Sequence, residues 1–234
     1  MRLLGMCLNT AWMILLKTCY ENTFYICTHP DDEAFGPAGT IAKLARDGHQ
    51  IWIVSMCQGN RPGAEDVAIS RQTAFASSCT ALGAYPVLLK SDDVYLDYHV
   101  AVNEITRIVN GVKPDAVYTH SLADIHRDHR ITAEACMVAC RPKPDSSVQS
   151  LYTCEIPAST DWGFNQFGTF QPQVYVDITE YMEIKRTVME LYSTEVYEYP
   201  DARSIKSMEV MAQNRGRQVG LEFAEAFQLV YKRD

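Results

Sequence analysis

The densest group of reactive side chains in this sequence is the run HPDDE at residues 29–33, which directly follows the apolar residues 24–27. Three adjacent carboxylates, Asp31, Asp32 and Glu33, repel one another, and packing gives no reason for them at the end of a buried strand. A cation, or a proton shared at the site, offsets that repulsion. Because His29 stands beside the carboxylates, we expect the cation to be a metal ion.

A second group of reactive side chains comprises His126, Asp128 and His129. The two histidines are three residues apart at the expected start of a helix over residues 131–140, so they face roughly the same way. Imidazole is a preferred zinc ligand. Taken alone, the group is either a metal site or an ordinary set of polar residues at a helix start.

The elements that must position these two groups alternate along the chain. Apolar runs predict strands at 24–27, 51–57, 87–89 and 115–119, and helical periodicity predicts helices at 36–47, 66–82 and 99–112. This alternation is typical of a parallel sheet with right-handed crossovers. Ligands bind such sheets outside the carboxyl ends of the strands. Both groups follow a predicted strand, so we expect them to converge on one crevice.

The rest of the chain completes the expected fold. Further strands are predicted at 149–155, 173–177 and 229–231, and further helices run up to residue 191 and from residue 204. The long loop 156–172 carries Trp162, Phe164, Phe167 and Phe170, for which core packing is favoured over stacking on a sugar ring. We therefore expect an α/β protein, a single-domain Rossmann-like three-layer sandwich with a mostly parallel central sheet.

Composition limits the classes of partner. With 234 residues and 47% hydrophobic side chains, the chain can bury a full core as one domain. A net charge of −8 without clustered Lys and Arg argues against nucleic-acid binding and favours a small or glycan-like partner. The 8 cysteines form no CxxC pair, which is typical of buried thiols in a reducing cytoplasm.

Residues 1–22 are set apart as an N-terminal extension of uncertain role, and residues 23–234 form the expected domain. The extension is mostly apolar, but it is shorter than the roughly 20 apolar residues that span a bilayer. No small-x-small cleavage site of the kind that ends a signal peptide precedes Lys17. An extra helix packed on the body is the favoured interpretation, and membrane association through this segment is the alternative. No stable membrane insertion is expected.

The two motifs together resemble the PIG-L/LmbE family of zinc-dependent amino-sugar N-deacetylases. HPDDE at 29–33, GTIA at 39–42 and HRDH at 126–129 carry the resemblance. Weaker similarity extends through Arg71, Leu82, Gly83, Asp93 and Leu96 to RGRQVG at 215–220 and AEAF at 224–227. The similarity covers roughly residues 24–230, and HPDDE followed by the HxDH pattern is its specific part.

The resemblance implies a role for each matching residue. His29, Asp32 and His129 would bind Zn²⁺, with Fe²⁺ and Co²⁺ as alternative native metals, and a water would complete an open catalytic site. Asp31 would be the general base, and His126 would stabilise the developing charge and protonate the departing amine.

Four further residues have supporting roles in this interpretation. Asp128 and Glu33 are candidates for orienting imidazoles or backbone, with a helix-start charge as the alternative for Glu33. The resemblance places Arg71 and Asp93 where family members contact the sugar or its substituent. Ala74 departs from the family, which often carries a glutamate at that position.

The expected activity is removal of the N-acetyl group from an N-acetylglucosamine-type amino sugar or its conjugate, by zinc-assisted hydrolysis with Asp31 as base. One alternative is a related amidase that cleaves a larger acyl amide. Another is a noncatalytic sugar- or metal-binding module on the same fold, which would need neither Asp31 nor His126. The oligomeric state stays open, with a homo-oligomer as one option.

Overall fold

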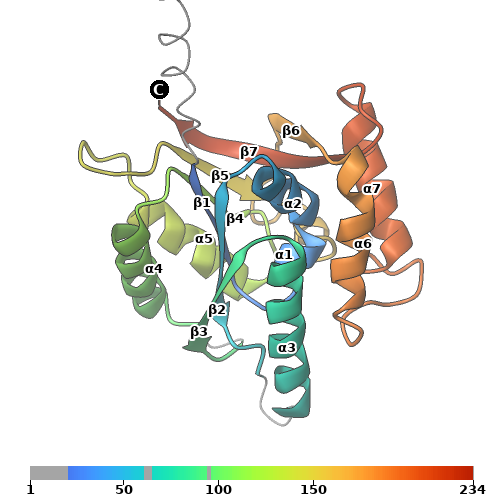
Figure 1. Ribbon diagram of the computed structural model, residues 1–234, viewed down its shortest axis with the longest axis horizontal. Coiled ribbons are helices and arrows are strands. Elements are labelled where there is room, and N and C mark those ends of the chain that lie inside the picture. Colours follow the sequence, from blue (N-terminus) through green and yellow to red (C-terminus); the bar gives the residue numbers. More distant parts are fainter. Residues whose placement is uncertain (1–20, 61–64, 94–95, 234) are drawn as a thin grey trace, which may run out of the picture.

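The computed structural model describes residues 21–60, 65–93 and 96–233, which fold around a seven-stranded sheet (Figure 1). The strand order is β3-β2-β1-β4-β5-β7-β6. The first five strands are parallel to their neighbours, and β7 is antiparallel to both β5 and β6. The strands are β1 (Asn22–Cys27), β2 (Gln50–Cys57), β3 (Tyr85–Ser91), β4 (Ala116–His120), β5 (Ser150–Cys154), β6 (Val174–Asp177) and β7 (Ala224–Lys232).

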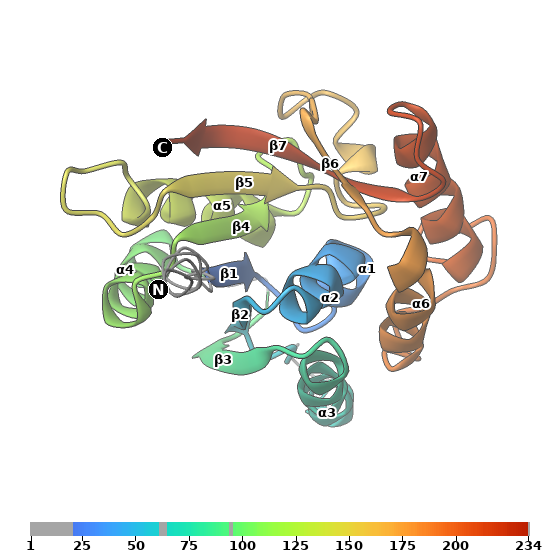
Figure 2. The same cartoon turned by 45° about the horizontal axis from the view of Figure 1, so that its top comes forward.

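Helices cover both faces of the sheet (Figures 1 and 2). Helices α4 and α5 pack on one face, and α1, α2, α3, α6 and α7 lie on the other. The helices are α1 (Asp32–Phe35), α2 (Ala38–Arg46), α3 (Glu65–Ala81), α4 (Tyr98–Val112), α5 (Arg127–Ala139), α6 (Met182–Glu190) and α7 (Ile205–Arg217). Two short 3-10 helices, Asp161–Gly163 and Thr179–Tyr181, precede β6 and α6.

Each face of the sheet has its own hydrophobic core. Successive side chains of a strand point to opposite faces, so Tyr25 and Cys27 join the core under α1, α2, α3, α6 and α7. Phe24 and Ile26, the alternate residues of β1, join the core under α4 and α5. The α/β class and the mostly parallel sheet predicted from the sequence are confirmed.

Element boundaries differ from prediction at several places. The helix expected over 36–47 is shorter and corresponds to α2 alone. A separate short helix, α1, precedes it, and Pro37, which has no N–H with which to continue α1, stands between the two. Helix α5 begins at Arg127 rather than at residue 131, so His129 lies in its first turn. Strand β7 is longer than the expected 229–231 because it includes Glu225, a charged residue that interrupts the apolar pattern.

The prediction for residues 1–22 falls almost entirely outside the described residues. Among residues 21–60, 65–93 and 96–233, no helix is long and apolar enough to cross a bilayer. The six cysteines of this part of the chain are buried and free, as predicted: Cys27, Cys57, Cys79, Cys136, Cys140 and Cys154.

The strand order creates a crevice at the carboxyl ends of β1 and β4. Strand β1 pairs with β2 on one side and with β4 on the other, so the chain leaves β1 and β4 at the point where the strand order reverses. Binding sites of open parallel sheets lie at such a point. The segments that begin at Thr28 and Ser121 therefore start side by side.

Candidate metal centre

Three predicted ligands from the two segments meet in this crevice. His29 Nδ1 lies 3.2 Å from His129 Nε2, which lies 3.4 Å from Asp32 Oδ1. Asp32 Oδ2 is 3.8 Å from His29 Nδ1. Ligand atoms about 2.0–2.2 Å from a tetrahedral Zn²⁺ are separated by roughly 3.3 Å, so this spacing fits a metal ion. All three residues are buried. Three groups of side chains in the described part of the chain have possible ligand atoms within 4.8 Å of one another, and each includes at least one of these residues: His29, His126 and His129; Asp32, His120 and His129; and His29, Cys57 and Asp93.

A carboxylate fixes the orientation of the His129 ring. His129 Nδ1 lies 3.0 Å from Asp124 Oδ2, so Nε2 points at the cluster. The same oxygen of Asp124 accepts hydrogen bonds from Ser159 Oγ at 2.7 Å and Thr160 Oγ1 at 3.1 Å, and its other oxygen accepts from the backbone N–H of His126 at 2.7 Å. Metal-binding histidines typically have such a carboxylate partner. The sequence analysis did not single out Asp124, which orients the imidazole of His129.

The cluster favours a positive charge. Burial alone would lower the pKa of His129, but the carboxylates of Asp32 and Asp124 raise it to about 9. Burial likewise opposes ionisation of Asp32, yet the imidazoles of His129 and His120 hold the pKa of that carboxyl well below its usual range. Two backbone N–H groups, from Thr28 at 3.2 Å and His29 at 2.8 Å, donate to Asp32 Oδ2. A metal cation can take the place of the proton that these carboxylates favour.

His29 presents its other ring nitrogen to Asp128. The separation between His29 Nε2 and Asp128 Oδ2 is 3.8 Å, and both side chains are buried. With Nε2 on that side, Nδ1 is the atom that faces Asp32 and His129. Asp128 therefore lies beside the imidazole of His29, and its role in orienting that ring stays a prediction.

Asp31, which directly precedes one of the three ligands, pairs with two arginines. Its backbone has φ 136°, a strained conformation for a residue with a side chain and one that clusters at functional sites. Its Oδ2 lies 2.6 Å from Arg203 Nη2 and 3.3 Å from Arg71 Nη2. The two neighbouring aspartates thus have different partners.

Glu33 supports the backbone of Asp31. Its Oε2 accepts the Asp31 N–H at 3.1 Å, and its Oε1 accepts the Tyr192 hydroxyl at 2.5 Å. The side chain is fully buried, and this burial raises its pKa to about 7. Glu33 thus orients backbone, which is one of the two roles considered for it, and it is no solvated charge at a helix start.

Arg71 and Asp93, the predicted substrate contacts, form a buried brace under the turn. Arg71 donates to the carbonyl oxygen of Pro30 through Nε at 3.2 Å and Nη2 at 3.1 Å. Its Nη1 donates to Asp93 Oδ2 at 2.9 Å, and Asp93 Oδ1 accepts the Gly59 N–H at 3.0 Å. Only 2% of Arg71 and 1% of Asp93 are exposed, so their contact with a substrate stays a prediction.

His126 borders the cluster without joining its hydrogen bonds. It is the N-cap residue of α5, and its ring centroid lies 4.8 Å from that of His29 and 4.6 Å from that of His129. Burial, reinforced by the two neighbouring imidazoles, lowers its pKa to about 4. The ring is neutral near pH 7, so it has one N–H to donate and one nitrogen that can accept a proton.

The sequence analysis assigned no role to His120, the last residue of β4. The ring is fully buried, its Nε2 accepts the Thr28 N–H at 2.9 Å, and it stacks on His129 with 4.0 Å between centroids. Because the Nε2 lone pair already binds the chain, His120 supports the site by packing and by holding Thr28. Its place at the carboxyl end of a central strand was the signal that could have identified it.

The aromatic side chains of the long loop are not core residues, contrary to the favoured interpretation of the sequence. Trp162 is 48% exposed, Phe164 73% and Phe167 43%. The start of the loop contacts the site through the hydrogen bonds that Ser159 and Thr160 donate to Asp124. These aromatic side chains therefore lie on the surface, while the start of their loop supports His129.

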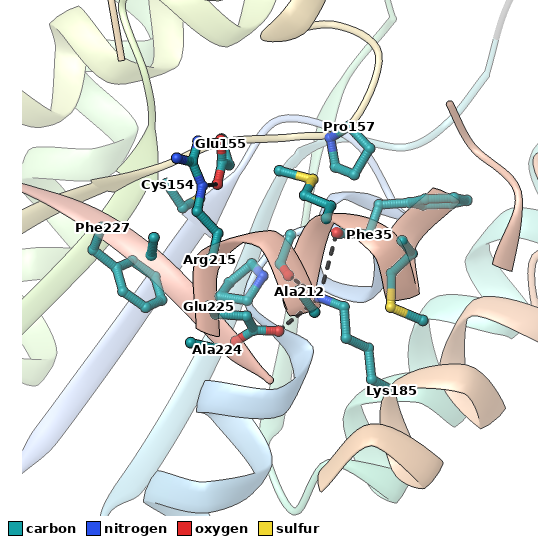
Figure 3. A pocket seen from close by; sticks show the side chains of 15 residues that line it. Phe35, Cys154, Glu155, Pro157, Lys185, Ala212, Arg215, Ala224, Glu225 and Phe227 are labelled. Carbon is teal, nitrogen blue, oxygen red and sulfur yellow. Dashed lines mark hydrogen bonds and ion pairs between the residues drawn. The ribbon is translucent and has the colours of Figure 1, made fainter. Parts of the chain in front are cut away.

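A small cavity lies beside the turn that follows the cluster (Figure 3). Its volume is about 30 Å³, enough for a few water molecules, and none of its lining residues belongs to the cluster. Lys185 lies at this cavity, and its Nζ donates to Glu225 Oε1 at 2.6 Å and to the carbonyl oxygen of Gly36. Glu225 in turn accepts the N–H groups of Gly39 at 2.9 Å and Thr40 at 2.7 Å. This buried pair ties α6 and β7 to the α1–α2 turn.

Comparison with known proteins places this arrangement in context. Residues 24–140 match the sequence model of the PIG-L family, described as GlcNAc-PI de-N-acetylase. YaiS, an uncharacterised deacetylase of Escherichia coli (strain K12), is 26% identical over 178 residues, which are 72% of this chain and 89% of YaiS.

Solved structures with this fold include enzymes of different reactions. The N,N'-diacetylchitobiose deacetylase of Pyrococcus horikoshii has a TM-score of 0.74 at 21% identity, over 90% of this chain and 84% of its own. GalB of Pseudomonas putida, a 4-carboxy-2-hydroxymuconate hydratase, has a TM-score of 0.70 at 19% identity, over 92% of this chain and 98% of its own. The shared fold therefore does not decide the reaction, and the site residues must.

Proposed function

This chain belongs to the PIG-L family, and from that premise we propose that it is a metal-dependent N-deacetylase of amino sugars. The substrate is an N-acetylglucosamine-type sugar or its conjugate, and the products are acetate and the free amine. One observation carries the proposal. Candidate ligand atoms of His29, Asp32 and His129, which come from two distant segments, lie 3.2 to 3.8 Å apart, and the neighbouring Asp31 pairs with an arginine instead.

The donor set fits a catalytic metal ion. Two imidazoles and one carboxylate are a common ligand set for Zn²⁺, and the same donors accept Fe²⁺ and Co²⁺. His29 would bind through Nδ1 and His129 through Nε2, since their other ring nitrogens face Asp128 and Asp124. When bound, such an ion polarises the amide carbonyl and lowers the pKa of water towards about 7.

The remaining chemistry belongs to side chains of this protein. Asp31 accepts a proton from the water that attacks the acetyl carbonyl carbon. The neutral ring of His126 donates its N–H towards the oxygen on which negative charge develops. The amide nitrogen needs a proton before the C–N bond breaks. The proton that Asp31 took from the water returns to that nitrogen through His126, which accepts a proton on one ring nitrogen and gives one up from the other, so that both side chains regain their starting states. General acid or base help of this kind contributes roughly a hundredfold to ten-thousandfold in rate.

The three-layer, Rossmann-like arrangement expected from the sequence supports this assignment. Both motifs lie at the carboxyl edge of the sheet, at the point where the strand order reverses. The hydratase GalB shares the fold, so the reaction is assigned from the residues of the site and from the family.

A panel of amides tests the proposal. Zinc-loaded protein is incubated with N-acetylglucosamine, N,N'-diacetylchitobiose and an N-acetylglucosaminyl glycoside, and acetate and primary amine are measured in the same samples. Equal amounts of the two products support the proposal, and hydrolysis should cease after chelation and return with zinc. N-propionyl and N-butyryl analogues address the alternative amidase. If these longer amides are cleaved faster than the N-acetyl compounds, the substrate carries a larger acyl group and the amidase alternative is correct.

Failure on the whole panel would contradict the proposal. The matched control is Asp161→Asn, a change at an exposed aspartate of the long loop, which should hydrolyse the panel like the wild type. Zinc-loaded protein that binds the sugars without releasing amine would favour the noncatalytic module instead.

A further inference from the structure

The segment between α6 and α7 delivers three side chains to the HPDDE turn. Tyr192 donates its hydroxyl to Glu33, Glu195 Oε1 lies 3.8 Å from Arg71 Nε, and Arg203 reaches Asp31. This segment lies outside the part of the chain that matches the family, residues 24–140. Of the three, Arg203 is the one that contacts a proposed catalytic group directly.

Arg203 is held firmly in front of Asp31. Its Nη2 donates to Asp31 Oδ2 at 2.6 Å and lies 3.5 Å from Glu195 Oε2. Its guanidinium carbon lies 4.2 Å from the centroid of the Phe35 ring. A planar guanidinium can stack and donate at once, which an ammonium group cannot do.

The backbone that carries Arg203 is also fixed. Asp201 Oδ1 accepts the Arg203 N–H at 2.8 Å. The next residue, Ser204, is the N-cap of α7, and its Oγ accepts the Ser207 N–H at 3.1 Å. The position of this guanidinium is therefore set by the start of a helix on one side and by an aromatic ring on the other.

Both cations that face Asp31 occupy the same carboxylate oxygen. Arg203 Nη2 at 2.6 Å and Arg71 Nη2 at 3.3 Å both end on Oδ2. Within the described part of the chain, no ion pair of Asp31 ends on Oδ1, which makes Oδ1 the oxygen that can receive the proton of a water. A base fixed in this way needs no reorientation before it reacts.

We propose that Arg203 is a positioning residue that holds the carboxylate of Asp31 by Oδ2 and so aims Oδ1 at the attacking water. The inference rests on the proposed function, in which Asp31 is the base. The contacts of the Arg203 guanidinium are with Asp31, Glu195 and Phe35. Its effect on the rate must therefore pass through Asp31.

Two substitutions of Arg203 separate the contribution of its positive charge from that of its planar guanidinium group. Arg203→Met removes both, and Arg203→Lys keeps a cation of similar length. For Arg203→Met we expect kcat to fall by about ten- to a hundredfold, the scale of a misplaced reacting group, while KM and zinc content stay within about twofold of wild type. Arg203→Lys should recover part of the lost kcat. An unchanged kcat in Arg203→Met, or a loss explained by zinc content, would overturn the proposal.

The matched control is Arg186→Met. Arg186 joins α6 to α7 through an ion pair with Glu209 at 2.5 Å, so Arg186→Met removes an arginine–carboxylate contact from the two helices that flank the Arg203 segment, away from the site. Its kcat should match that of the wild type. An equal loss of kcat in Arg186→Met and Arg203→Met would show that the rate depends on the packing of the two helices, which would also overturn the proposal.

A double-substitution cycle tests whether Arg203 acts through Asp31. In the Asp31→Asn background the base is absent, so adding Arg203→Met should leave the residual kcat unchanged within about twofold. Losses that multiply would mean that Arg203 acts on something other than Asp31, and the proposal would fail.

The same four proteins give a measurement that needs no activity. Arg203→Met should lower the urea midpoint of unfolding more in the wild-type background than in the Asp31→Asn background, because the ion pair exists only in the first. Equal shifts would refute the contact. If the wild type hydrolyses no amide, the proposed function fails, and this unfolding cycle still decides whether Arg203 and Asp31 are coupled.

Discussion

Replacing Asp124 by Asn should weaken metal binding, because this residue fixes the ring of His129. Asp124 Oδ2 faces His129 Nδ1 at 3.0 Å, and the other carboxylate oxygen accepts the His126 N–H at 2.7 Å. An asparagine has one oxygen and one NH₂ group. Whichever way the amide is turned, its NH₂ group therefore faces either the N–H of His126 or the Nδ1–H of His129.

The size of the effect follows from that mismatch. A buried donor left without an acceptor costs about 1–3 kcal/mol. Loss of the partner of a metal-binding histidine typically weakens metal affinity by about 10- to 100-fold, which corresponds to about 1.4 to 2.7 kcal/mol. The two estimates agree, so we expect the zinc dissociation constant of Asp124→Asn to rise by about 10- to 100-fold.

Zinc affinity is measured by competition with a chromophoric chelator at fixed pH. The matched control is Asp161→Asn, in the loop that also supplies Ser159 and Thr160; Asp161 Oδ2 accepts the Ala158 N–H at 3.2 Å and does not contact a histidine. The control should bind zinc like the wild type. A dissociation constant for Asp124→Asn within twofold of wild type would refute the assignment of Asp124 as the residue that orients His129.

Three further predictions concern buried groups. Burial raises the pKa of Glu33 from 4.5 to about 7, so between these pH values the folded protein keeps a proton that the unfolded chain releases. The free energy of unfolding of the metal-free protein should therefore fall as the pH rises from 5 to 8. Glu33→Gln cannot ionise and should flatten this slope, so equal slopes in urea titrations of both proteins would contradict the prediction. Burial raises the pKa of the Cys136 thiol to about 12, and the other five described cysteines are buried as well. At pH 8 a thiol reagent should therefore leave these six cysteines unmodified in the native protein. Fast reaction of more than two of the 8 thiols would contradict this prediction. Lys185→Met should destabilise the protein by about 3–5 kcal/mol, because it leaves Glu225 buried without its cation. A second substitution in the same protein, Glu225→Gln, should recover part of this loss. A larger loss of stability in the double variant than in Lys185→Met would contradict this account of the pair.

The main features of the site could be predicted from the sequence because each motif is local. His29 and Asp32 are three residues apart, His129 follows the next sheet-centre strand, and strand–helix alternation sends both segments to one edge of the sheet. The partners of these residues are a different matter. Whether Asp124 or Asp128 meets His129 depends on the path of the chain between β4 and α5, which no periodicity describes.

Contacts between distant segments were beyond prediction for the same reason. Arg203 meets Asp31 only because the chain after α6 returns across the turn, a separation of 172 residues. The bonds of Glu225 to Gly39 and Thr40 cross from β7 to α2 in the same way, so no role for this carboxylate could be predicted from the sequence. The exposed aromatic side chains of the long loop were misplaced because composition cannot tell an apolar residue that packs inward from one that remains on the surface.

The roles of the two neighbouring aspartates are the central claim, and zinc titration of Asp31→Asn and Asp32→Asn tests it most directly. Asp31→Asn should bind one zinc ion per chain with the affinity of the wild type, although its turnover falls by roughly a hundredfold or more, because the proton acceptor is lost and no ligand is. Asp32→Asn should lose affinity for zinc, and excess zinc should restore part of its turnover, because a charged oxygen ligand is replaced by a weaker neutral one. Loss of zinc binding in Asp31→Asn with full binding in Asp32→Asn would reverse the two roles and contradict the account.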